Sequence, residues 1–313
     1  MNDSINKMKS LGISFFYIDE KQAEHIITTE YTAAKLMKYA AIFDRYRATE
    51  KKGQFVELDF SYLYDIALID TELRKIVFGM CIDVEETVKA ILAADIIRAS
   101  CSDRIVTDFV NSDQEYLTAT YTAANLDTTA AEILGNTPIA DLSLDDFLYV
   151  ISFGTLQRFA RFFYLLYAEE LYNRKHAPFE PYLDSVRVLR NACAHNNTLL
   201  GQLSIDSNQP VAFLKNYSVI SYLGNHGVKH RTLETNMSKA CIHDLCCLLH
   251  LSSFLLPKER AQSSISKFLD FLRFRCTENR WYYIKAPNLL SAHRFLCDVS
   301  AIYYNESGKS LDK

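Results

Sequence analysis

The segment TELRKIVFGMCIDVEETVKAIL, residues 71–92, has the apolar spacing of a long amphipathic helix. Its apolar side chains recur every three or four residues, which places them on one face of an α-helix. Asp70 or Thr71 is expected to cap the N-terminus of a helix that runs from about residue 71 to 98. Glu85 and Lys89 stand four residues apart, in the order that favours an ion pair. The apolar stripe consists of Leu73, Ile76, Val77, Met80, Val84, Val88, Ile91 and Leu92.

The composition favours helices along the whole chain. The 313 residues include only 9 Gly and 6 Pro, and 49% are hydrophobic. So few turn-forming residues argue against β-sandwiches and barrels, and so many apolar residues argue against a disordered chain. We predict an all-α fold: a helical bundle with additional C-terminal helices, in one continuous globular domain.

The same spacing predicts further helices and an organisation of the chain. We expect an N-terminal tail over residues 1–20, a helical core over 21–200, and a polar connector with packed C-terminal helices over 201–313. Phe15, Phe16 and Tyr17 are expected to anchor the tail, residues 211–223 to form a short strand pair or an irregular helix, and residues 300–313 to fray. The other expected helices are 20–49 with a break near Thr28–Thr29, one capped by Asp59 or Ser61, 144–175 capped by Ser143, 182–195, 237–256 and 261–276.

Neither the net charge nor a targeting segment points to nucleic acid, secretion or a membrane. A formal charge of −4 provides no global indication of a nucleic-acid partner, which usually needs a basic surface. The first residues lack the apolar run of a signal peptide, and no stretch is long enough to span a membrane. We therefore expect a cytoplasmic protein with no membrane partner and with cysteines packed as small apolar residues.

A cluster of cysteines and histidines near residue 245 raises the question of a metal site. Its residues form two pairs one helical turn apart, but one helix cannot complete a tetrahedral site and no matching pair occurs elsewhere. Phosphate-loop, dinucleotide-binding and zinc-protease motifs are also absent from the sequence. We expect core packing for the cluster, no metal and no cofactor. The cluster consists of Cys241, His243, Cys246, Cys247 and His250.

The segment SVRVLRNACAHNN, residues 185–197, carries the most informative chemistry in the chain. His195 follows Arg190 by five residues, with Asn191 beside the arginine and three small residues between. Histidine titrates near neutral pH and can act as a general acid or base, whereas arginine holds phosphate with two parallel donors. The pair suits metal-independent cleavage of RNA, in which a 2′-hydroxyl attacks the adjacent phosphate. The spacing alone also fits a structural arginine and a hydrogen-bonded histidine.

Within that segment, LRNACAH (residues 189–195) resembles the Arg-x4-His signature of the HEPN superfamily. The chain from about residue 35 to 200 is similar to abortive-infection proteins of the AbiD/AbiF type. This resemblance implies a HEPN-like helical bundle, a role in phage defence, RNA binding and RNA cleavage. The segments that carry it are MKYAAIFDRYR (37–47), FSYLYDIALIDTELRKIVFGMCIDVEETVKA (60–90), SFGTLQRF (152–159) and YLDSVRVLRNACAHNNTL (182–199).

By this resemblance, Arg190 and His195 form the catalytic pair, and Asn191 orients them. In the proteins that the chain resembles, such sites are composite, with two motifs facing each other across a dimer interface. We therefore expect an isologous homodimer, because a single chain would hold half a site. The alternative is a monomer that uses a basic groove only for binding.

Two positions near the pair depart from the family pattern. The family often has a second histidine where this chain has Asn196, and it has an arginine where this chain has Thr198. The loss of a basic group is expected to weaken the hold on phosphate without changing the Arg–His pair. The expected supporting residues are Glu86, Lys89, Asn196 and Asn197.

Two basic stretches are expected to bind RNA. Arginines bind phosphates and aromatic rings stack on bases, which together hold single strands. For the second stretch, residues 260–285, a solvated helix face with a few core aromatic residues is the favoured interpretation. The aromatic residues there are Phe271, Phe274, Trp281, Tyr282 and Tyr283. The expected RNA-binding residues are Arg158, Arg161, Arg187, Arg273, Arg275 and Arg280, with Arg174 and Lys175 also in the first stretch.

Three functional hypotheses remain. The leading one is a metal-independent HEPN endoribonuclease that acts in phage defence. The alternative is a non-catalytic RNA-binding protein of the same fold, which holds a small structured noncoding RNA. The third is a purely protein-binding toxin or antitoxin partner.

Overall fold

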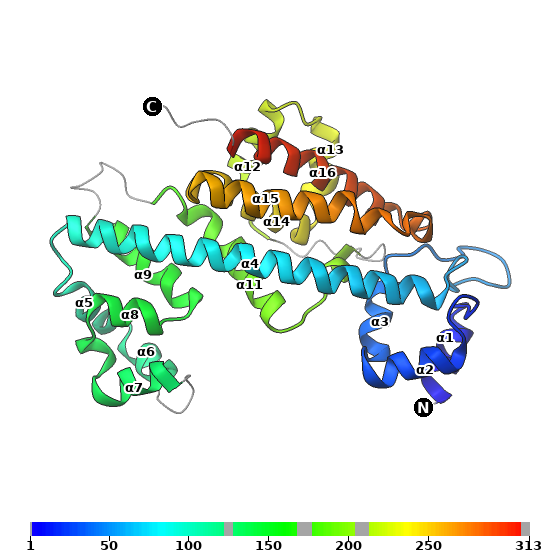
Figure 1. The fold of residues 1–313 in the computed structure, drawn as a ribbon, viewed down its shortest axis with the longest axis horizontal. Helices are drawn as coiled ribbons and strands as arrows, with labels where there is room; N and C mark the ends of the chain where they lie inside the picture. The colour runs from blue at the N-terminus through cyan, green and yellow to red at the C-terminus, as the bar shows by residue number, and fades with distance from the viewer. Residues whose placement is uncertain (1, 122–127, 168–176, 204–212, 308–313) are drawn as a thin grey trace. The chain divides into compact units, whose positions relative to one another are not determined.

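The computed structural model describes residues 2–121, 128–167, 177–203 and 213–307, and helices dominate these ranges (Figure 1). The described residues contain no β-strand, and two isolated bridges are their only β-type pairings. The predicted all-α fold is confirmed. The chain forms two compact units: unit 1 comprises Met1–Cys81 and Val188–Lys313, and unit 2 comprises Ile82–Arg187.

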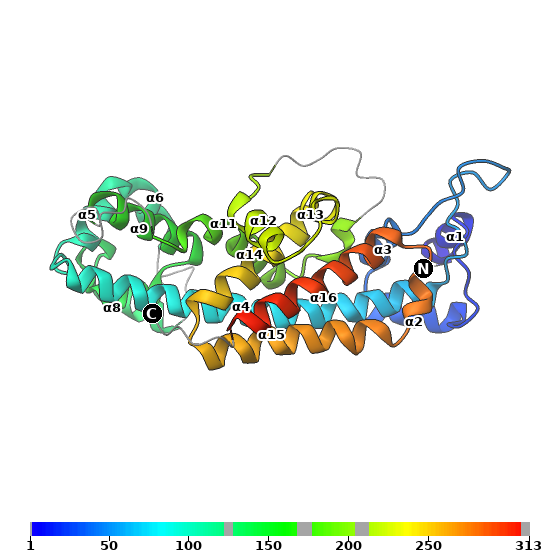
Figure 2. The same ribbon diagram turned by 90° about the horizontal axis from the view of Figure 1, so that it is seen from above.

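Unit 1 is built around the first part of helix α4 (Phe60–Arg98), which continues into unit 2 beyond Cys81. Helices α15 and α16 pack against each other and against α14, and Figure 2 shows both running alongside this part of α4. The other helices of unit 1 are α1 (Asn2–Ser10), α2 (Glu20–Thr29), α3 (Ala33–Ala40), α12 (Tyr217–Asn225), α13 (His230–Met237), α14 (Ala240–Leu255), α15 (Lys258–Arg273) and α16 (Pro287–Ser307). Short 3₁₀ turns join them: η3 (Leu200–Leu203), η4 (Arg275–Thr277) and η5 (Arg280–Tyr283).

Unit 2 has a small aromatic core. The rings of Phe109, Phe147 and Phe159 lie with centroids 4.9 to 6.0 Å apart, in edge-on arrangements that aromatic pairs favour. Helix α11 (Glu180–Ala194) begins in unit 2 and ends in unit 1. The helices wholly within unit 2 are α5 (Ile105–Ser112), α6 (Gln114–Thr120), α7 (Thr128–Asn136), α8 (Leu144–Val150) and α9 (Phe153–Leu166), with the turn η2 (Ile139–Asp141) between α7 and α8.

Helix α4 corrects one prediction. The sequence predicts a helix boundary with Asp70 or Thr71 as the cap, but α4 is one helix of 39 residues with both of them inside it. Asp70 is completely buried. Its carboxylate accepts hydrogen bonds from the backbone amides of Leu199 and Leu200, as a capping aspartate accepts amides of its own helix. Asp70 therefore accepts amides as a capping residue does, but from a segment that is distant in the sequence and not from its own helix.

Two other predicted helices differ in their extent. Ser143 caps α8 as predicted, accepting a hydrogen bond from the Asp146 amide, but the predicted helix over 144–175 is broken after Val150. Ser152 accepts a hydrogen bond from the Thr155 amide and starts α9 as a second cap. The predicted break in 20–49 is confirmed, because α2 ends at Thr29 and Thr32 caps α3.

The described residues at both ends of the chain form helices where the sequence predicts a tail and a frayed end, and residues 308–313 of that end lie outside the described residues. Residues 2–10 of the expected tail form α1, which buries Ile5 and Met8. Of the three expected anchors, Phe15 stacks on Phe60 with ring centroids 5.4 Å apart, whereas Phe16 is 80% exposed and Tyr17 is 51% exposed. At the other end, α16 continues to Ser307 because buried side chains such as Tyr303 hold the last turns against unit 1.

Three further sequence predictions concern residues 211–223, the pair Glu85 and Lys89, and membrane-spanning segments. Of the residues 211–223, those from Tyr217 onward form α12, which favours the predicted helix over the strand pair. The predicted ion pair between Glu85 and Lys89 is present at 3.4 Å. In the part of the chain that the structure describes, no helix has the length and apolar character needed to cross a membrane.

Candidate functional site

The Arg-x4-His motif occupies the C-terminal end of α11. The Asn197 amide donates to the Ala192 carbonyl at 2.9 Å, and the Asn196 amide donates to the Cys193 carbonyl at 3.1 Å. These two bonds form the αL-type helix ending known as a Schellman motif, and Asn196 takes the left-handed conformation that it requires, with φ 55°. Asparagine tolerates this conformation better than most residues with a side chain. His195 is therefore presented at the exposed end of a well-terminated helix.

The three expected catalytic residues differ in exposure. His195 is exposed, whereas Arg190 and Asn191 are half-buried. The His195 amide donates to the Asn191 carbonyl at 3.0 Å, so these two residues lie one turn apart on the same side of α11. Arg190 precedes His195 by five residues, which places it about 140° away around an ideal helix.

A buried polar cluster on α4 holds the segment that follows His195. The Asp70 carboxylate accepts the Leu199 amide at 3.0 Å, the Leu200 amide at 2.8 Å and the Tyr39 hydroxyl at 2.7 Å. Arg74, one turn along α4, forms a buried ion pair with the same carboxylate. Burial raises the pKa of Asp70, against the opposing effects of the Leu200 amide, Tyr39 and Arg74. We call Asp70, Arg74 and Tyr39 the Asp70 cluster.

Helix α3 brings two lysines to the same segment. The Lys35 ammonium donates to the Asn196 carbonyl at 3.2 Å, and burial together with the positive Arg74 lowers the pKa of Lys35. Lys38 lies close to Gly201, where an added Cβ would stand 3.5 Å from the Lys38 Cβ and 2.6 Å from the Thr198 hydroxyl oxygen. Sequence reasoning missed Lys35, because 161 residues separate it from Asn196 and no local pattern marks it.

The positions that depart from the family pattern have structural roles. Asn196 supplies the left-handed residue of the helix ending, as described above. Thr198 is buried and so close to Gly201 that the turn needs a residue without a Cβ there. Asn197, expected as a supporting residue, is exposed beside them.

The remaining two supporting residues lie in the other unit. Glu86 and Lys89 belong to the part of α4 in unit 2, whereas Arg190 and His195 belong to unit 1. Glu86 is exposed, and Lys89 is engaged by Glu85. Their supporting role stays a prediction.

The cysteine thiols near the motif are buried or half-buried and are expected to be unreactive. Burial raises the pKa of the Cys193 thiol to about 12, so it is protonated at neutral pH and is a poor nucleophile. Cys241, Cys246 and Cys247 are buried on α14 beside His243, whose Nε2 accepts the Asn216 amide at 2.8 Å. The predicted core packing of this cluster is confirmed. Among the described residues, no group of three or more His, Cys, Asp or Glu could hold a metal ion.

The expected RNA-binding arginines of unit 2 are paired with acids. Arg158 forms an ion pair with Asp113 and stands 4.5 Å over the Tyr116 ring. Arg161 lies 3.7 Å from Glu180, and Arg187 lies 3.1 Å from Asp184. Each guanidinium therefore has a neighbouring carboxylate that an RNA phosphate would have to replace. Arg174 and Lys175 lie outside the described residues.

The three arginines of unit 1 differ from one another. Arg275 is held by three carboxylates, those of Asp65, Glu72 and Glu278, each at 3.1 or 3.2 Å. Arg273 and Arg280 are exposed, and neither has an ion-pair partner in the part of the chain that the structure describes. The positive charge on this side of unit 1 is thus available at Arg273 and Arg280 and neutralised at Arg275.

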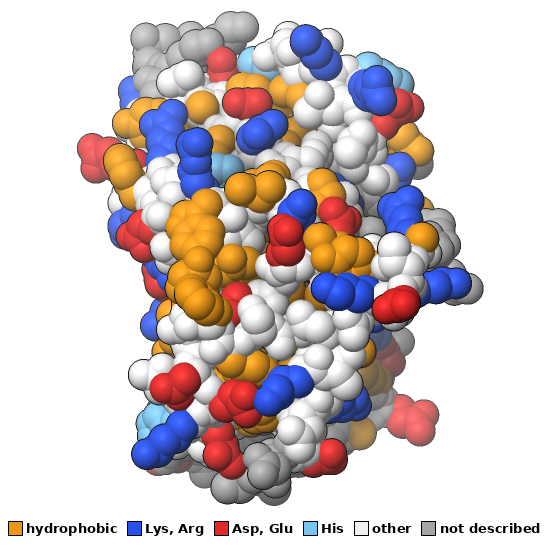
Figure 3. Space-filling view, turned by 90° about the vertical axis from the view of Figure 1, so that its right-hand side faces the viewer, with side chains coloured by type: hydrophobic (Ala, Val, Ile, Leu, Met, Phe, Trp, Pro, Cys, Tyr) orange, Lys and Arg blue, Asp and Glu red, His pale blue; other side chains and the backbone are white. Residues whose placement is uncertain are grey.

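An aromatic cluster lies on the surface of unit 1. Tyr62 stacks on Tyr282 with centroids 4.3 Å apart, and Trp281 meets Tyr282 edge-on at 4.2 Å. Tyr17 lies 5.4 Å from Trp281 and 5.0 Å from Phe16. Figure 3 shows hydrophobic side chains gathered on the face with the N-terminal helices, with Lys and Arg among them. Of the aromatic residues expected there from the sequence, Phe271 and Tyr283 are instead buried in the core.

The fold and the site together define an all-helical protein with an Arg–His pair at an exposed helix end. The family model described as Abi-like protein matches residues 27–200, which is more than half of the chain. The chain belongs to this family of Abi-like proteins. No curated protein and no solved structure matches it. The match ends at Leu200, so it covers the motif and the segment that the Asp70 cluster holds.

Proposed function

We propose that this protein is a phage-defence endoribonuclease of the HEPN type, which binds RNA and cleaves it without a metal ion, in the cytoplasm. The observation that carries the proposal is the exposed His195 at the end of α11, on a segment fixed by the Asp70 cluster and contacted by Lys35. Membership of the Abi-like family supports the role in abortive infection.

The proposed reaction uses a histidine and an arginine for separate tasks. His195 removes the proton from a 2′-hydroxyl, and the resulting oxygen attacks the adjacent phosphorus. The bond from phosphorus to the 5′-oxygen breaks, and the protonated His195 returns its proton to that oxygen, which leaves a 2′,3′-cyclic phosphate and a 5′-hydroxyl. Arg190 stabilises the charge that develops on the phosphate, and Asn191 orients the pair. Lys35 and Lys38 add positive charge near the scissile phosphate.

We propose that the active form is a homodimer. A spacing of five residues corresponds to about 140° on an ideal helix, which favours a site that a second copy completes. A twofold axis beside the helix ends would allow Arg190 of one copy to act with His195 of the other.

The proposed path for the RNA strand follows two arginines that have no ion-pair partner among the described residues, together with the exposed rings. Arg273 and Arg280 bind phosphates, and the aromatic cluster of unit 1 stacks bases. Arg158, Arg161 and Arg187 join the path only after exchanging their carboxylate partners for phosphate, so we expect their contribution to be smaller.

The direct test is cleavage of total RNA in EDTA by the full-length protein and its His195→Ala variant. We expect cyclic-phosphate ends from the wild type. The variant should cleave RNA at a rate that is lower by a factor of about 100 or more. His230→Ala removes another exposed histidine of unit 1 and serves as the matched control. Intact RNA with both the wild type and the variant would exclude the nuclease.

Subunit mixing tests the composite site. Arg190→Ala and His195→Ala chains are each expected to be inactive, whereas their mixture forms heterodimers with one intact pair. Recovery of cleavage on mixing supports the dimer, and a monomer by light scattering at the concentrations of the assay would contradict it.

A non-catalytic RNA-binding function is the second proposal. The exposed aromatic cluster supports it, because base stacking needs no reactive group. This alternative predicts salt-dependent binding of a small noncoding RNA that His195→Ala leaves unchanged and that Trp281→Ala weakens. Absence of any salt-dependent RNA binding would contradict both proposals.

A further inference from the structure

A pocket of about 510 Å³ lies within unit 1, between α4, α15, η5 and α16. Its size is in the range that holds a small organic ligand. Most of the lining is aliphatic: Ile66, Ile69 and Leu73 come from α4, and Leu289, Leu290 and Leu296 come from α16. Leu200 and Leu203 of η3 complete the wall, so water inside would meet few polar partners.

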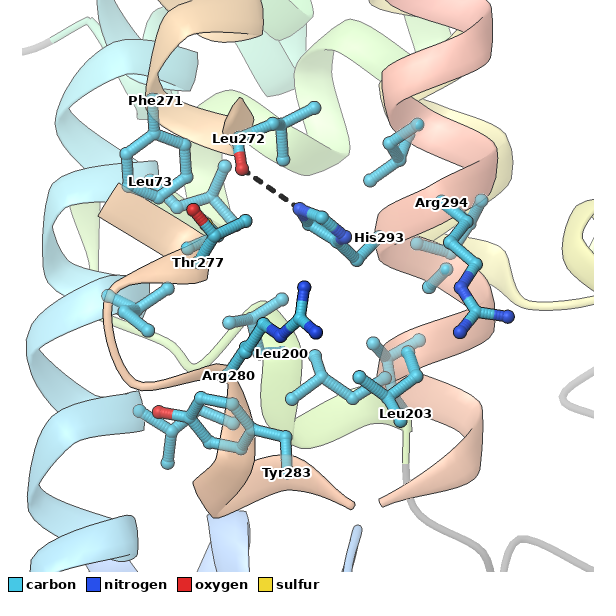
Figure 4. A pocket seen from close by; sticks show the side chains of 18 of the residues that line it. Leu73, Leu200, Leu203, Phe271, Leu272, Thr277, Arg280, Tyr283, His293 and Arg294 are labelled. Atoms are coloured by element: carbon cyan, nitrogen blue, oxygen red, sulfur yellow. Dashed lines mark hydrogen bonds between the residues drawn. The ribbon is translucent and has the colours of Figure 1, made fainter. Parts of the chain in front are cut away.

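Two arginines stand among these apolar side chains. Arg280 and Arg294 line the pocket, and both are exposed to solvent. Figure 4 shows the Arg280 guanidinium extending into the pocket toward His293, with Arg294 on α16 at the edge. Neither arginine has a carboxylate partner in the described part of the chain.

Arg275 contrasts with the two arginines that line the pocket. It precedes Arg280 by five residues and is surrounded by the carboxylates of Asp65, Glu72 and Glu278. Among the described residues, Arg275 is thus neutralised by carboxylates, whereas Arg280 and Arg294 in the pocket have no carboxylate partner, as is also true of the exposed Arg273 outside it. An anion at the pocket would supply the missing charge through paired hydrogen bonds.

The Nε2 atom of His293 does not act as a hydrogen-bond acceptor that would repel an anion. Its Nε2 lies 2.9 Å from the Leu272 carbonyl oxygen, and since a carbonyl only accepts, Nε2 must carry the hydrogen. The other polar side chain in this part of the wall is Thr277, whose hydroxyl donates to the Arg273 carbonyl at 2.7 Å. The polar end of the pocket thus offers cationic donors and no carboxylate.

We propose that this pocket binds a fatty-acid-like molecule, with its alkyl chain among the aliphatic residues and its carboxylate at Arg280 and Arg294. Burial of the chain supplies most of the affinity, and the arginines select the charge of the head group. The pocket contains neither Arg190 nor His195, but it shares Arg280 and Trp281 with the proposed RNA path.

The test uses dodecanoate and the intrinsic fluorescence of the full-length protein. Trp281 is the single tryptophan of the sequence and lines the pocket, so its emission reports directly on occupancy. We expect saturable binding of dodecanoate and no binding of dodecyltrimethylammonium, which has the same chain length and the opposite charge. Shortening the acid to octanoate should weaken binding on the order of 100-fold, since four buried methylene groups are lost.

Variants at the head group separate this site from nonspecific association. Arg280→Gln with Arg294→Gln should weaken dodecanoate binding about tenfold or more, because charge-assisted hydrogen bonds are lost. Both side chains are exposed, so the variant should fold as the wild type does. Arg231→Gln, which removes an exposed arginine of α13 that does not line the pocket, is the matched control and should bind normally. Equal binding of the anionic and cationic amphiphiles, unchanged binding by the double variant, or no binding at all would overturn the proposal.

Discussion

Helix α4 carries two clusters of similar composition and different exposure. Asp70, with Arg74 and Tyr39, is buried and also accepts two backbone amides. Asp65 accepts hydrogen bonds from the Arg275 guanidinium at 3.1 Å and the Tyr283 hydroxyl at 2.5 Å, with Asn279 at 3.2 Å. Both clusters tie a distant segment to α4 through one aspartate.

The difference lies in how much water each cluster meets. The side chains of Asp70 and Arg74 are 0% and 4% exposed, whereas Arg275 is 18% exposed and its partner Glu72 is 45% exposed. If a charged group of the Asp70 cluster loses its partner, no water can take that partner's place. In the Asp65 cluster, water can solvate the remaining charges and offset part of the lost interaction energy. The Asp70 cluster therefore fixes the segment after His195 rigidly, and the Asp65 cluster holds the η4–η5 region with less energy at stake.

The largest predicted effect is at Asp70. Asp70→Ala leaves Arg74 charged and buried, and leaves the Leu199 and Leu200 amides without an acceptor, so we expect a loss of about 3–5 kcal/mol in the free energy of unfolding. Urea denaturation measures it. Asp65→Ala is the matched change and should cost about half as much. Equal losses would show that exposure does not separate the two clusters.

The arginines give the next test of the comparison. Arg275→Met removes three ion pairs but leaves Glu72 and Glu278 in reach of water and Asp65 with its donors Tyr283 and Asn279, so we expect a loss of about 1–2 kcal/mol that shrinks in high salt. Arg74→Met should cost more and respond little to salt, because Asp70 is shielded. Thermal unfolding at low and high ionic strength distinguishes the two. A larger salt effect at Arg74 would contradict the ranking.

The tyrosines test the hydrogen bonds without changing a charge. Tyr39→Phe removes a donor to a completely buried carboxylate, and we expect a loss of about 2 kcal/mol. Tyr283→Phe removes the donor to Asp65, which keeps Arg275 and Asn279, and should cost about 1 kcal/mol. Both rings stay buried, so packing is conserved and the difference measures the hydroxyls.

The smallest predicted effect is at the end of α11, which the Asp70 cluster supports. Asn196→Ala places a Cβ in a left-handed conformation without a polar side chain and should cost about 1 kcal/mol. Asn196→Gly should be neutral or slightly stabilising, because glycine adopts this conformation without strain. A loss with glycine as large as with alanine would assign Asn196 a side-chain role in place of the backbone role.

The sequence located the motif but misjudged what supports it. Arg190, Asn191 and His195 are close in the sequence, so a local pattern reveals them. The structure places them at the C-terminal end of α11, where the sequence predicts a helix end. Asp70 was expected as a helix cap from its residue type, and only its contacts with Tyr39 and Leu199 explain its position inside α4. Lys35 had no signal, since its contact with Asn196 spans 161 residues.

The sequence alone determined that the protein is all-helical, because helices form from hydrogen bonds between neighbouring turns and reveal themselves as apolar periodicity. It also determined where the Arg–His pair and its helix lie. The tertiary structure alone decided that one helix runs through Asp70 and that an apolar pocket lies beside Arg280 and Arg294. It also decided that Arg275 is neutralised, whereas Arg280 and Arg294 have no carboxylate partner among the residues that the structure describes. These features depend on which distant side chains meet and on how much water remains between them, and neither is written in the local order of residues.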